Sequence, residues 1–447
     1  MQLNNTGKPV GRALAAATCA LLGVQATNTQ AKGNPGEWDV ETALLVYAES
    51  DSRVNAIEPV ISATRNFDGE RQLNLKLVAD TLTGASPSGA TPSDLPQTFT
   101  SPSGSGSYSI APGEAPLDDT FKDTRVALSA AWSAPINRDY AYSVGGYASR
   151  EYDYFSTALN GSLSRYLNNK NTTLTGGLSL GMDLIDPVGG APVGLSRMPL
   201  RDGKTEAEFD QEFTATRESD DSKALVDALF GVTQVINRQT LMQFNYAVSY
   251  SSGYLTDPYK LLSVIDDASG ANYGGNLIGA DGNPVYLYEN RPDSRLKHAL
   301  YWQTKYMLTN GDVVDGSYRF MIDDWGISSH TVDLKYRWRL ANSYLEPHFR
   351  YYMQSEADFY KRYLTATEYN NGAPALTEAS ADYRLGELTG LTLGAKWGYR
   401  FDEDRELAIR AEYMIQSNDG DEGFGQLTNH DLYPDTDAMW VQLSYSF

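Results

Sequence analysis

Charged side chains recur at every second position between residues 328 and 341. Asp333, Lys335, Arg337 and Arg339 alternate there with large apolar residues. Because successive side chains of a β-strand point to opposite faces, these four charges would lie on one face of a strand. Fixed charges that line an aqueous pore select ions and solutes by their charge. The spacing therefore predicts charge selection as the chemistry of this segment.

Similar rows of charges occur in the flanking segments, and adjacent strands would bring the rows within reach of one another. The residues that we predict to line a lumen and to set its selectivity are Arg319, Asp323, Asp333, Lys335, Arg337, Arg339, Glu346, His348, Arg350, Lys396, Arg400, Arg410 and Glu412. In a pore, these rows of mixed charge would select solutes by their charge. The same charges could instead pair with one another and only stabilise the wall, and the residues leave both interpretations open.

Segments with the same alternation recur along the chain, each long enough for a membrane-crossing strand, which needs ~9–11 residues. The predicted strands are 38–48, 54–66, 70–82, 123–135, 140–153, 155–167, 172–186, 223–235, 240–252, 298–309, 313–324, 328–341, 344–356, 388–401, 406–417 and 437–447. These sixteen segments predict an all-β fold, a single transmembrane antiparallel β-barrel over residues 32–447.

The energetic cost of charge in lipid decides which face of these strands points inward. A basic residue that faces lipid costs ~2–4 kcal/mol at the bilayer midplane. Several such residues would consume about the whole net stability of a typical fold, 5–15 kcal/mol. The charged face of 328–341 must therefore line the lumen, and the polar faces of 240–252 and 406–417 follow the same rule. Alternation alone would also fit a sheet of a soluble protein. The sequences of the two termini distinguish a membrane barrel from that alternative.

The N-terminus has the pattern of a signal peptide. Lys8 and Arg12 precede an apolar run, 13–24, that is too short to span a bilayer as a helix. We predict a signal peptide over residues 1–26, with cleavage after Ala26 or Ala31. The chain has one cysteine, Cys19, which lies inside this run. The exported protein would then have neither disulfides nor thiolate metal sites.

The C-terminus ends in an alternating aromatic strand. Val441, Leu443, Tyr445 and Phe447 share one face of the last ten residues. This strand resembles the signal by which outer-membrane barrels are recognised by the barrel assembly machinery, and we assign that role to Tyr445 and Phe447. Thirty tyrosines and seven tryptophans suit the aromatic girdles of such a barrel. We therefore predict a location in the outer membrane of a Gram-negative bacterium.

The lengths of the connections alternate between short and long, as they do in outer-membrane barrels. Short joints rich in Asn, Asp and Gly occupy every even position. The long connections fall at odd positions and are 83–122, 187–222, 253–297, 357–387 and 418–436. With both termini in the periplasm, every long loop would face the outside of the cell.

Two of the long loops have distinctive sequences. Residues 84–120 are dense in Pro, Ser and Gly, which predicts a flexible segment. The longest loop, 253–297, includes Asp257, Pro258, Tyr259 and Lys260 and then an apolar stretch, Leu261–Ile265. An apolar stretch needs shelter from water. The loop could fold into the lumen as a constriction or plug, or pack over the extracellular rim, and the sequence does not choose between these placements.

Composition argues against several classes of function. The net charge of −21 argues against nucleic acid as a partner. Of the four histidines, His330 near Asp323 and Asp324 is the nearest approach to a rim protease, but no specific motif is present, so we expect no enzyme activity. The acidic segment 419–422 lacks the spacing of a calcium loop. A loosely held divalent ion between acidic loops and lipopolysaccharide stays open, and we predict no cofactor.

Several segments together resemble a known family. They are Gly253–Lys260, Asn290–Arg295, Tyr318–Phe320, Asp323–Ile327, Tyr351–Tyr352 and Asp358–Tyr360. These segments resemble the proteobacterial outer-membrane β-barrel family labelled domain of unknown function thirty-five-seventy. The resemblance implies an exported barrel and brings neither an established activity nor catalytic residues. It also implies that loop 253–297 and the Asp323–Trp325 hairpin are functional surfaces.

Two functions fit these observations. The first is a channel or transporter for small charged solutes through a polar, Arg-containing lumen. The second is a scaffold barrel that sheathes or anchors a partner, either a lipoprotein or a redox (electron-transfer) module, as the neighbours of that family suggest. Outer-membrane lipid, lipopolysaccharide and the assembly machinery are the expected surroundings. The sequence does not choose between a monomer and a trimer.

Overall fold

The computed structural model describes residues 36–50, 53–118, 122–218, 221–272, 284–370 and 374–447. The predicted signal peptide, Cys19 and both cleavage points lie outside these residues. Within the described ranges, no helix has both the length and the apolar character needed to cross a membrane.

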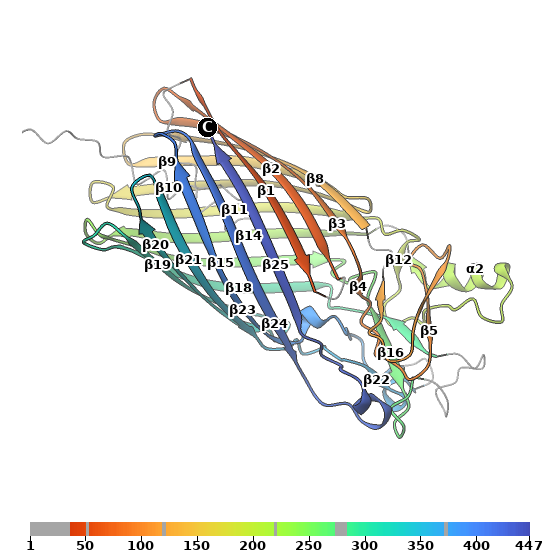
Figure 1. The fold of residues 1–447 in the computed structure, drawn as a ribbon. Helices are drawn as coiled ribbons and strands as arrows, with labels where there is room; N and C mark the ends of the chain where they lie inside the picture. The colour runs from red at the N-terminus through yellow and green to blue at the C-terminus, as the bar shows by residue number, and fades with distance from the viewer. Residues whose placement is uncertain (1–35, 51–52, 119–121, 219–220, 273–283, 371–373) are drawn as a thin grey trace, which may run out of the picture.

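In the described part of the chain, sixteen strands form one closed antiparallel barrel (Figure 1). The last strand pairs with the first, and the backbone N–H groups of Val40 and Phe447 each donate to the other residue's carbonyl, at 2.8 and 2.9 Å. The strands are β1 (Trp38–Glu49), β2 (Asn55–Phe67), β3 (Arg71–Thr83), β8 (Lys122–Pro135), β9 (Tyr140–Arg150), β10 (Tyr154–Leu167), β11 (Thr172–Ile185), β14 (Asp221–Val235), β15 (Thr240–Gly253), β18 (Ser294–Met307), β19 (Val313–Asp323), β20 (Ser328–Arg339), β21 (Ser343–Gln354), β23 (Glu387–Arg400), β24 (Glu406–Asp419) and β25 (Thr436–Ser446). The predicted fold class and the strand count are confirmed.

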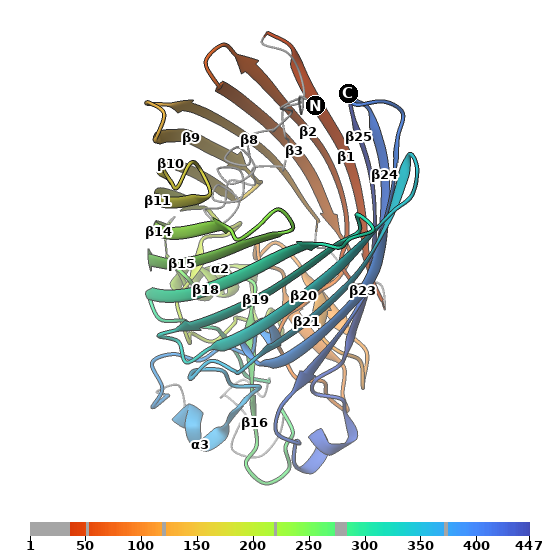
Figure 2. The same cartoon turned by 90° about the vertical axis from the view of Figure 1, so that its left-hand side faces the viewer.

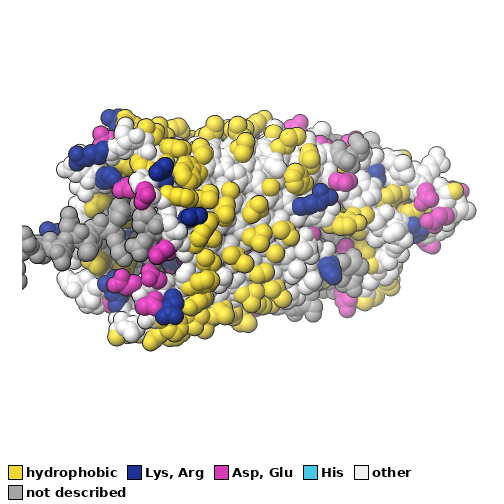
Figure 3. Space-filling model, turned by 90° about the horizontal axis from the view of Figure 1, so that it is seen from above, with side chains coloured by type: hydrophobic (Ala, Val, Ile, Leu, Met, Phe, Trp, Pro, Cys, Tyr) yellow, Lys and Arg dark blue, Asp and Glu magenta, His cyan; other side chains and the backbone are white. Residues whose placement is uncertain are grey.

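The two faces of the strands differ as the alternation predicts. On β15, Phe244 and Tyr250 are exposed on the outer surface, whereas Gln243 and Asn245 are buried inside. Outward Leu, Val, Ile and aromatic side chains form an apolar band around the barrel, with charged residues gathered beyond it at both ends (Figure 3). A band of this kind matches the hydrocarbon layer of a membrane.

The two ends of the barrel differ in their connections. Short turns join the strands at the end where Phe447 lies, which we call the turn end. One of these turns places Asn168, Asn169 and Lys170 at positive φ, a conformation that Asn tolerates better than most residues. The opposite end carries the long connections, and we call it the loop end (Figure 2).

The long connections fold together over the loop end. We call this part the cap; it consists of the described parts of the connections between β3 and β8, β11 and β14, β15 and β18, β21 and β23, and β24 and β25. Its elements are β4 (Ser86–Pro87), β5 (Gln97–Thr100), β6 (Ser107–Ile110), β7 (Leu117–Asp118), β12 (Ala191–Pro192), α2 (Glu206–Ala215), β13 (Arg217–Glu218), β16 (Leu261–Ile265), β17 (Tyr286–Tyr288), β22 (Leu364–Thr365), α3 (Ala366–Tyr369), η3 (Tyr383–Leu385) and η4 (Gly425–Asn429). Figure 1 shows these elements beyond the ends of the barrel strands.

The cap has a hydrophobic core of its own. β16 lies between β17 and β22 in a three-stranded sheet, and all five of its residues are buried. Leu262, Val264 and Leu364 are fully buried there against Leu287. Each such side chain contributes about 1.5–3 kcal/mol relative to exposure in water. The apolar stretch of loop 253–297 is thus sheltered in the cap over the rim, the second of the two placements that the sequence allowed.

The Pro-, Ser- and Gly-rich segment after β3 is folded into the same cap, so the expectation of a flexible segment is wrong. Phe99 is fully buried between Tyr108 and Tyr286, with ring centroids 5.3 and 4.7 Å away. The backbone N–H of Thr91 donates to Ser263 Oγ at 2.9 Å. Aromatic packing and hydrogen bonds to other cap segments therefore hold a segment whose composition predicts flexibility.

Candidate functional site

An ion network occupies the inner wall near the middle of β20, β21 and β24. His348 Nε2 lies 2.8 Å from Asp333 Oδ2, and His348 Nδ1 lies 2.9 Å from Glu412 Oε1. Lys335 pairs with Asp333 at 3.1 Å, and Arg410 pairs with Glu412 at 3.3 Å. Both ring nitrogens can donate to the two carboxylates only when the imidazole carries both protons. The network joins five of the predicted lumen residues into one rigid unit.

A second cluster surrounds Tyr344, nearer the turn end. Arg337 Nε donates to Glu346 Oε2 at 2.6 Å, and its guanidinium lies 4.4 Å from the centre of the Tyr344 ring. Tyr344 donates to Glu406 at 2.7 Å, and Glu406 also accepts from Arg400 at 3.0 Å. Opposite charges therefore neutralise one another along this part of the wall.

The other predicted residues differ in their surroundings. Arg319, Arg339, Arg350 and Lys396 have no carboxylate within 4.0 Å among the described residues, so their charge is not cancelled locally. Asp323 is different, because its side chain is fully buried, accepts from Arg295 Nε at 2.8 Å, and accepts from two backbone N–H groups of the β19–β20 turn. Asp323 fixes that hairpin and does not present its charge to the lumen.

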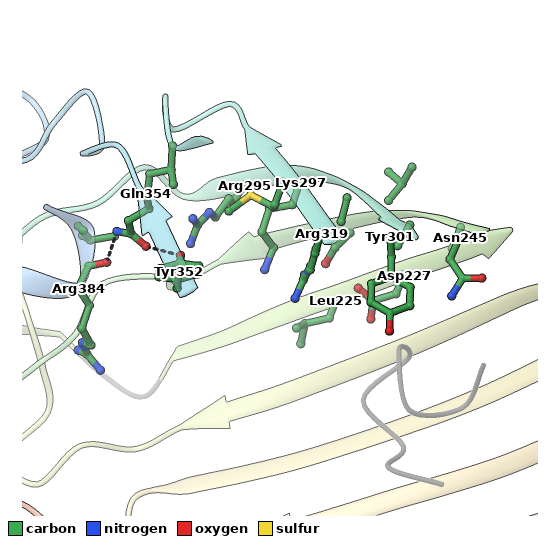
Figure 4. Close-up of a pocket in the computed structure, with 18 of the residues that line it drawn as sticks. Leu225, Asp227, Asn245, Arg295, Lys297, Tyr301, Arg319, Tyr352, Gln354 and Arg384 are labelled. Atoms are coloured by element: carbon green, nitrogen blue, oxygen red, sulfur yellow. Dashed lines mark hydrogen bonds between the residues drawn. The ribbon is translucent and has the colours of Figure 1, made fainter. Parts of the chain in front are cut away.

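A cavity of about 660 Å³ lies inside the barrel at the loop end, and we call it the chamber. Barrel residues form most of its wall, and cap residues on the β17–β18 connection and η3 form one side. Figure 4 shows charged side chains from both parts extending into this space. The cations that line it are Arg291, Arg295, Lys297, Arg319 and Arg384, and the lining carboxylates are Asp227 and Asp382.

The cap side of the chamber is a buried ion cluster. Asp382 accepts from Arg291 Nη2 at 2.8 Å and from Arg384 Nη2 at 2.6 Å. Burial alone would raise the pKa of Asp382, but the guanidinium of Arg384 outweighs it and holds the pKa well below its usual value. Arg384 also reaches Asp257 at 2.7 Å, on another cap loop. The cluster therefore fastens two cap loops to each other above the lumen.

Glu289 is a fully buried carboxylate of the same cluster. It accepts from the backbone N–H of Asp257 at 2.6 Å and from the Ser380 hydroxyl, and its Oε1 lies 2.6 Å from Arg291 Nε. Burial raises the pKa of Glu289 from 4.5 to about 7, against the opposing charge of Arg291. The folded cap thus favours the protonated form of Glu289 over the charged form.

This raised pKa gives the cap a defined pH dependence. An acid whose pKa is higher in the folded state stabilises the fold below its ordinary pKa, and that stabilisation is lost as pH rises through about 7. The shift from 4.5 to about 7 corresponds to about 3 kcal/mol. Glu289→Gln should remove this dependence, so that wild type loses cap stability relative to the variant between pH 5 and pH 8.

Limited proteolysis of the cap at several pH values measures the difference. Glu422→Gln, at an exposed carboxylate of the same cap, is the control and should follow wild type. Parallel pH profiles for Glu289→Gln and wild type would contradict the assignment.

The residues predicted as a constriction or plug lie at the junction of cap and barrel. Asp257 binds Arg384, and the hydroxyl of Tyr259 donates to Asp153 at the barrel rim. Lys260 is buried and donates to the carbonyl of Pro87, on the β3–β8 connection. Pro258 lies within the same short connection to β16. These contacts fasten the cap to the rim, and the role of the segment as a constriction or plug stays a prediction.

The histidines do not assemble a catalytic site with the acids considered above. His298 and His330 lie on the outer face of the barrel, and their Nδ1 atoms lie 2.8 and 2.6 Å from the hydroxyls of Tyr246 and Tyr318. Asp323 points to the inner face. His430 Nε2 lies 2.9 Å from Asp94 within the cap. Among the described residues, no three His, Cys, Asp or Glu side chains are placed to hold a metal ion.

Sequence reasoning missed several residues of the chamber. The predicted strand begins at residue 298, so it excludes Arg295 and Lys297, whereas β18 begins at Ser294. The signal was present, since Arg295 and Lys297 alternate with Leu296 and His298. Asp227 lies opposite Ser249 on the inward row of β14 and could have been found in the same way. Arg384 and Asp382 carry no strand pattern, and only the folded cap brings them to the lumen.

Comparison with known families gives a match over most of the sequence. The model of the family described as "Protein of unknown function (DUF3570)" matches residues 11–447. This is the family that the sequence motifs resemble. No curated protein matches the chain.

Several solved barrels have a similar architecture. The CymD monoaromatic hydrocarbon channel is 8% identical, with 100% of this chain and 93% of that chain covered and a TM-score of 0.38. The toluene transporter TodX from Pseudomonas putida is 12% identical, with coverages of 92% and 90% and a TM-score of 0.35. The siderophore receptor PirA from Pseudomonas aeruginosa is 8% identical, with coverages of 93% and 81% and a TM-score of 0.36. Likenesses this distant say nothing about what this chain carries.

Proposed function

The chain belongs to the DUF3570 family, and from this premise we propose that it forms a gated outer-membrane channel for small charged solutes. The observation that carries the proposal is the closed barrel with charged rows on its inner wall and a folded cap over one end. Fixed charges select what enters, and the cap controls when it enters. In this arrangement the loop end faces the outside of the cell and both termini face the periplasm.

The proposed surroundings follow from the outer surface. The apolar band lies in the lipid of the outer membrane, and the charged loop end meets lipopolysaccharide. Tyr445 and Phe447 lie at the turn end with their ring centroids 5.5 Å apart, and Phe447 is exposed. This position suits recognition by the barrel assembly machinery from the periplasmic side.

Single-channel recording in planar bilayers tests the proposal. We expect a stable open level on the order of hundreds of picosiemens, interrupted by long closures, because a barrel of this size has a wide lumen beneath a folded cap. A barrel that never conducts and that purifies together with a lipoprotein or a redox protein would instead support the scaffold function.

Charge exchange within one ion pair shows whether the wall selects ions. Arg337→Glu replaces a cation beside Glu346 with an anion, and should shift selectivity towards cations. The double variant Arg337→Glu with Glu346→Arg keeps the local charge balance and serves as the matched control, with selectivity close to that of wild type. Unaltered reversal potentials in the single variant would mean that this ion pair is structural.

A further inference from the structure

The chamber contains two cations that form no ion pair within 4.0 Å among the described residues. Arg291 and Arg384 are bound to Asp382, and Arg295 is bound to Asp323. Lys297 and Arg319 have no carboxylate within 4.0 Å among the described residues, although they line the same cavity. A cation in a partly enclosed cavity attracts an anion more strongly than it would in open water.

The charge balance of the chamber favours an anion. Of the two carboxylates that line the chamber, Asp227 forms no ion pair within 4.0 Å among the described residues. It lies in the same cross-strand row as Lys297, two strands away. Against this one negative charge stand Lys297 and Arg319. Lys297 and Arg319 therefore outnumber the one lining carboxylate that has no ion pair among the described residues.

Strand register explains why a cavity exists beside these two cations. Lys297 lies in one cross-strand row and Arg319 in another, opposite Tyr301. The row between them contains Ala247, Ala299 and Met321, and the small side chains of the two alanines leave space between the longer ones on either side. Figure 4 shows Lys297 and Arg319 extending from neighbouring strands into this space.

Part of the wall around the two cations is apolar. Leu225, Ala247, Ala299 and Met321 line the chamber, and Tyr301 adds an aromatic ring beside a polar hydroxyl. A small inorganic anion would leave such a wall in contact with water. An organic anion would cover the apolar wall while its charged group meets the cations, so that both parts of the surface gain a partner.

We propose that the chamber binds a small organic carboxylate, with the carboxylate held by Lys297 and Arg319 and the hydrocarbon part against Leu225, Ala247, Ala299 and Met321. The cap closes over the bound molecule through Arg384 and Leu385. This site deepens the proposed channel function, because it names the class of solute. It rests on that function only for the claim that the bound molecule passes through the barrel. Binding itself is independent of conduction.

Calorimetric titration of the purified mature protein in detergent tests the site without any need for an open pore. The probes are benzoate and hexanoate as organic carboxylates, inorganic phosphate as an anion without a hydrocarbon part, and benzylammonium as a matched cation. We expect benzoate and hexanoate to bind, phosphate to bind at least ~10-fold more weakly, and benzylammonium not to bind. Equal binding of phosphate and benzoate, or binding of benzylammonium, would overturn the proposal.

Variants assign the binding to these residues. Lys297→Met with Arg319→Met should weaken benzoate binding at least ~10-fold, because charged hydrogen bonds to the carboxylate are lost. Arg350→Met is the matched control, since Arg350 is an inward arginine that also lacks a nearby carboxylate and does not line the chamber. Equal loss in the control would show that general lumen charge, and not this site, binds the anion.

A third variant keeps the test valid if the double variant fails to fold. Asp227→Asn removes the unpaired lining carboxylate and should strengthen benzoate binding several-fold, in the opposite direction to any folding defect. Unchanged or weaker binding would contradict the site. Benzoate binding by a protein that never conducts in bilayers would keep the site and reject the channel, so the two failures can be told apart.

Discussion

Arg362→Met should convert a mostly closed barrel into a mostly open one. The Arg362 guanidinium donates to the carbonyls of Leu432, Gly89 and Ala90 at 2.8, 2.7 and 3.3 Å, and so ties together three connections of the cap. Methionine fills similar volume but donates nothing. Each partly buried carbonyl that loses its donor costs about 1–3 kcal/mol. A total of about 3 kcal/mol already changes an equilibrium between closed and open caps about a hundredfold.

Single-channel recording measures this change as the fraction of time spent open. We expect that fraction to rise at least ~10-fold, with the conductance of the open level unchanged, because the barrel itself is untouched. Lys361→Met is the matched control: it removes a neighbouring positive charge whose side chain is 40% exposed and forms a surface ion pair with Glu368 at 3.4 Å. An Arg362 variant that gates like this control would show that the cap does not close the channel.

Asp382→Asn should destabilise the cap more than any exposed substitution. The Asp382 side chain is 1% exposed and pairs with both Arg291 and Arg384, so the change removes the carboxylate that these two guanidinium groups share. Removing one partner of a buried ion pair typically costs ~3–5 kcal/mol. The effect should be largest near neutral pH, where Asp382 is fully ionised. It should shrink only at strongly acidic pH, because the lowered pKa of Asp382 means that the wild-type carboxylate becomes protonated only there.

Hydrogen exchange of the cap amides, followed by mass spectrometry, gives the measurement. Amides of β16 and β17 should exchange at least ~100-fold faster in Asp382→Asn, whereas barrel amides should exchange as in wild type. Asp202→Asn, at an exposed cap position, controls for the loss of a carboxylate. Unchanged exchange in β16 would mean that the ion cluster does not hold the cap together.

The barrel could be predicted closely because its signal is local and periodic. Every strand has one face in lipid, so alternation fixes both its extent and its orientation. The largest error is at the start of β18, where the alternation of Arg295 and Lys297 with Leu296 and His298 extends the strand beyond its predicted start at residue 298. The lumen residues around His348 can be predicted because side chains alternate between the two faces of each strand and because adjacent strands lie side by side.

The cap could not be predicted in the same way, because its contacts join distant parts of the chain. Phe99, Ser263 and Arg362 act on partners that no local pattern identifies. One local signal was available, since Thr205 and Glu208 form a capping box that begins α2. Predicting the chamber requires the structure of both the barrel and the cap, because Lys297 comes from the barrel and Arg384 from the cap.

The pairing of β16 with β22 has a consequence for assembly. These two strands run parallel and come from connections on opposite sides of β18 to β21, and Arg362 bonds to residues more than 270 positions away. Such contacts form slowly, since the intervening chain must first be ordered. The barrel hairpins are local by comparison and can form first. The cap core cannot form before the connection that contains β22 has been synthesised, so a nascent barrel stays uncapped until most of its strands have been made.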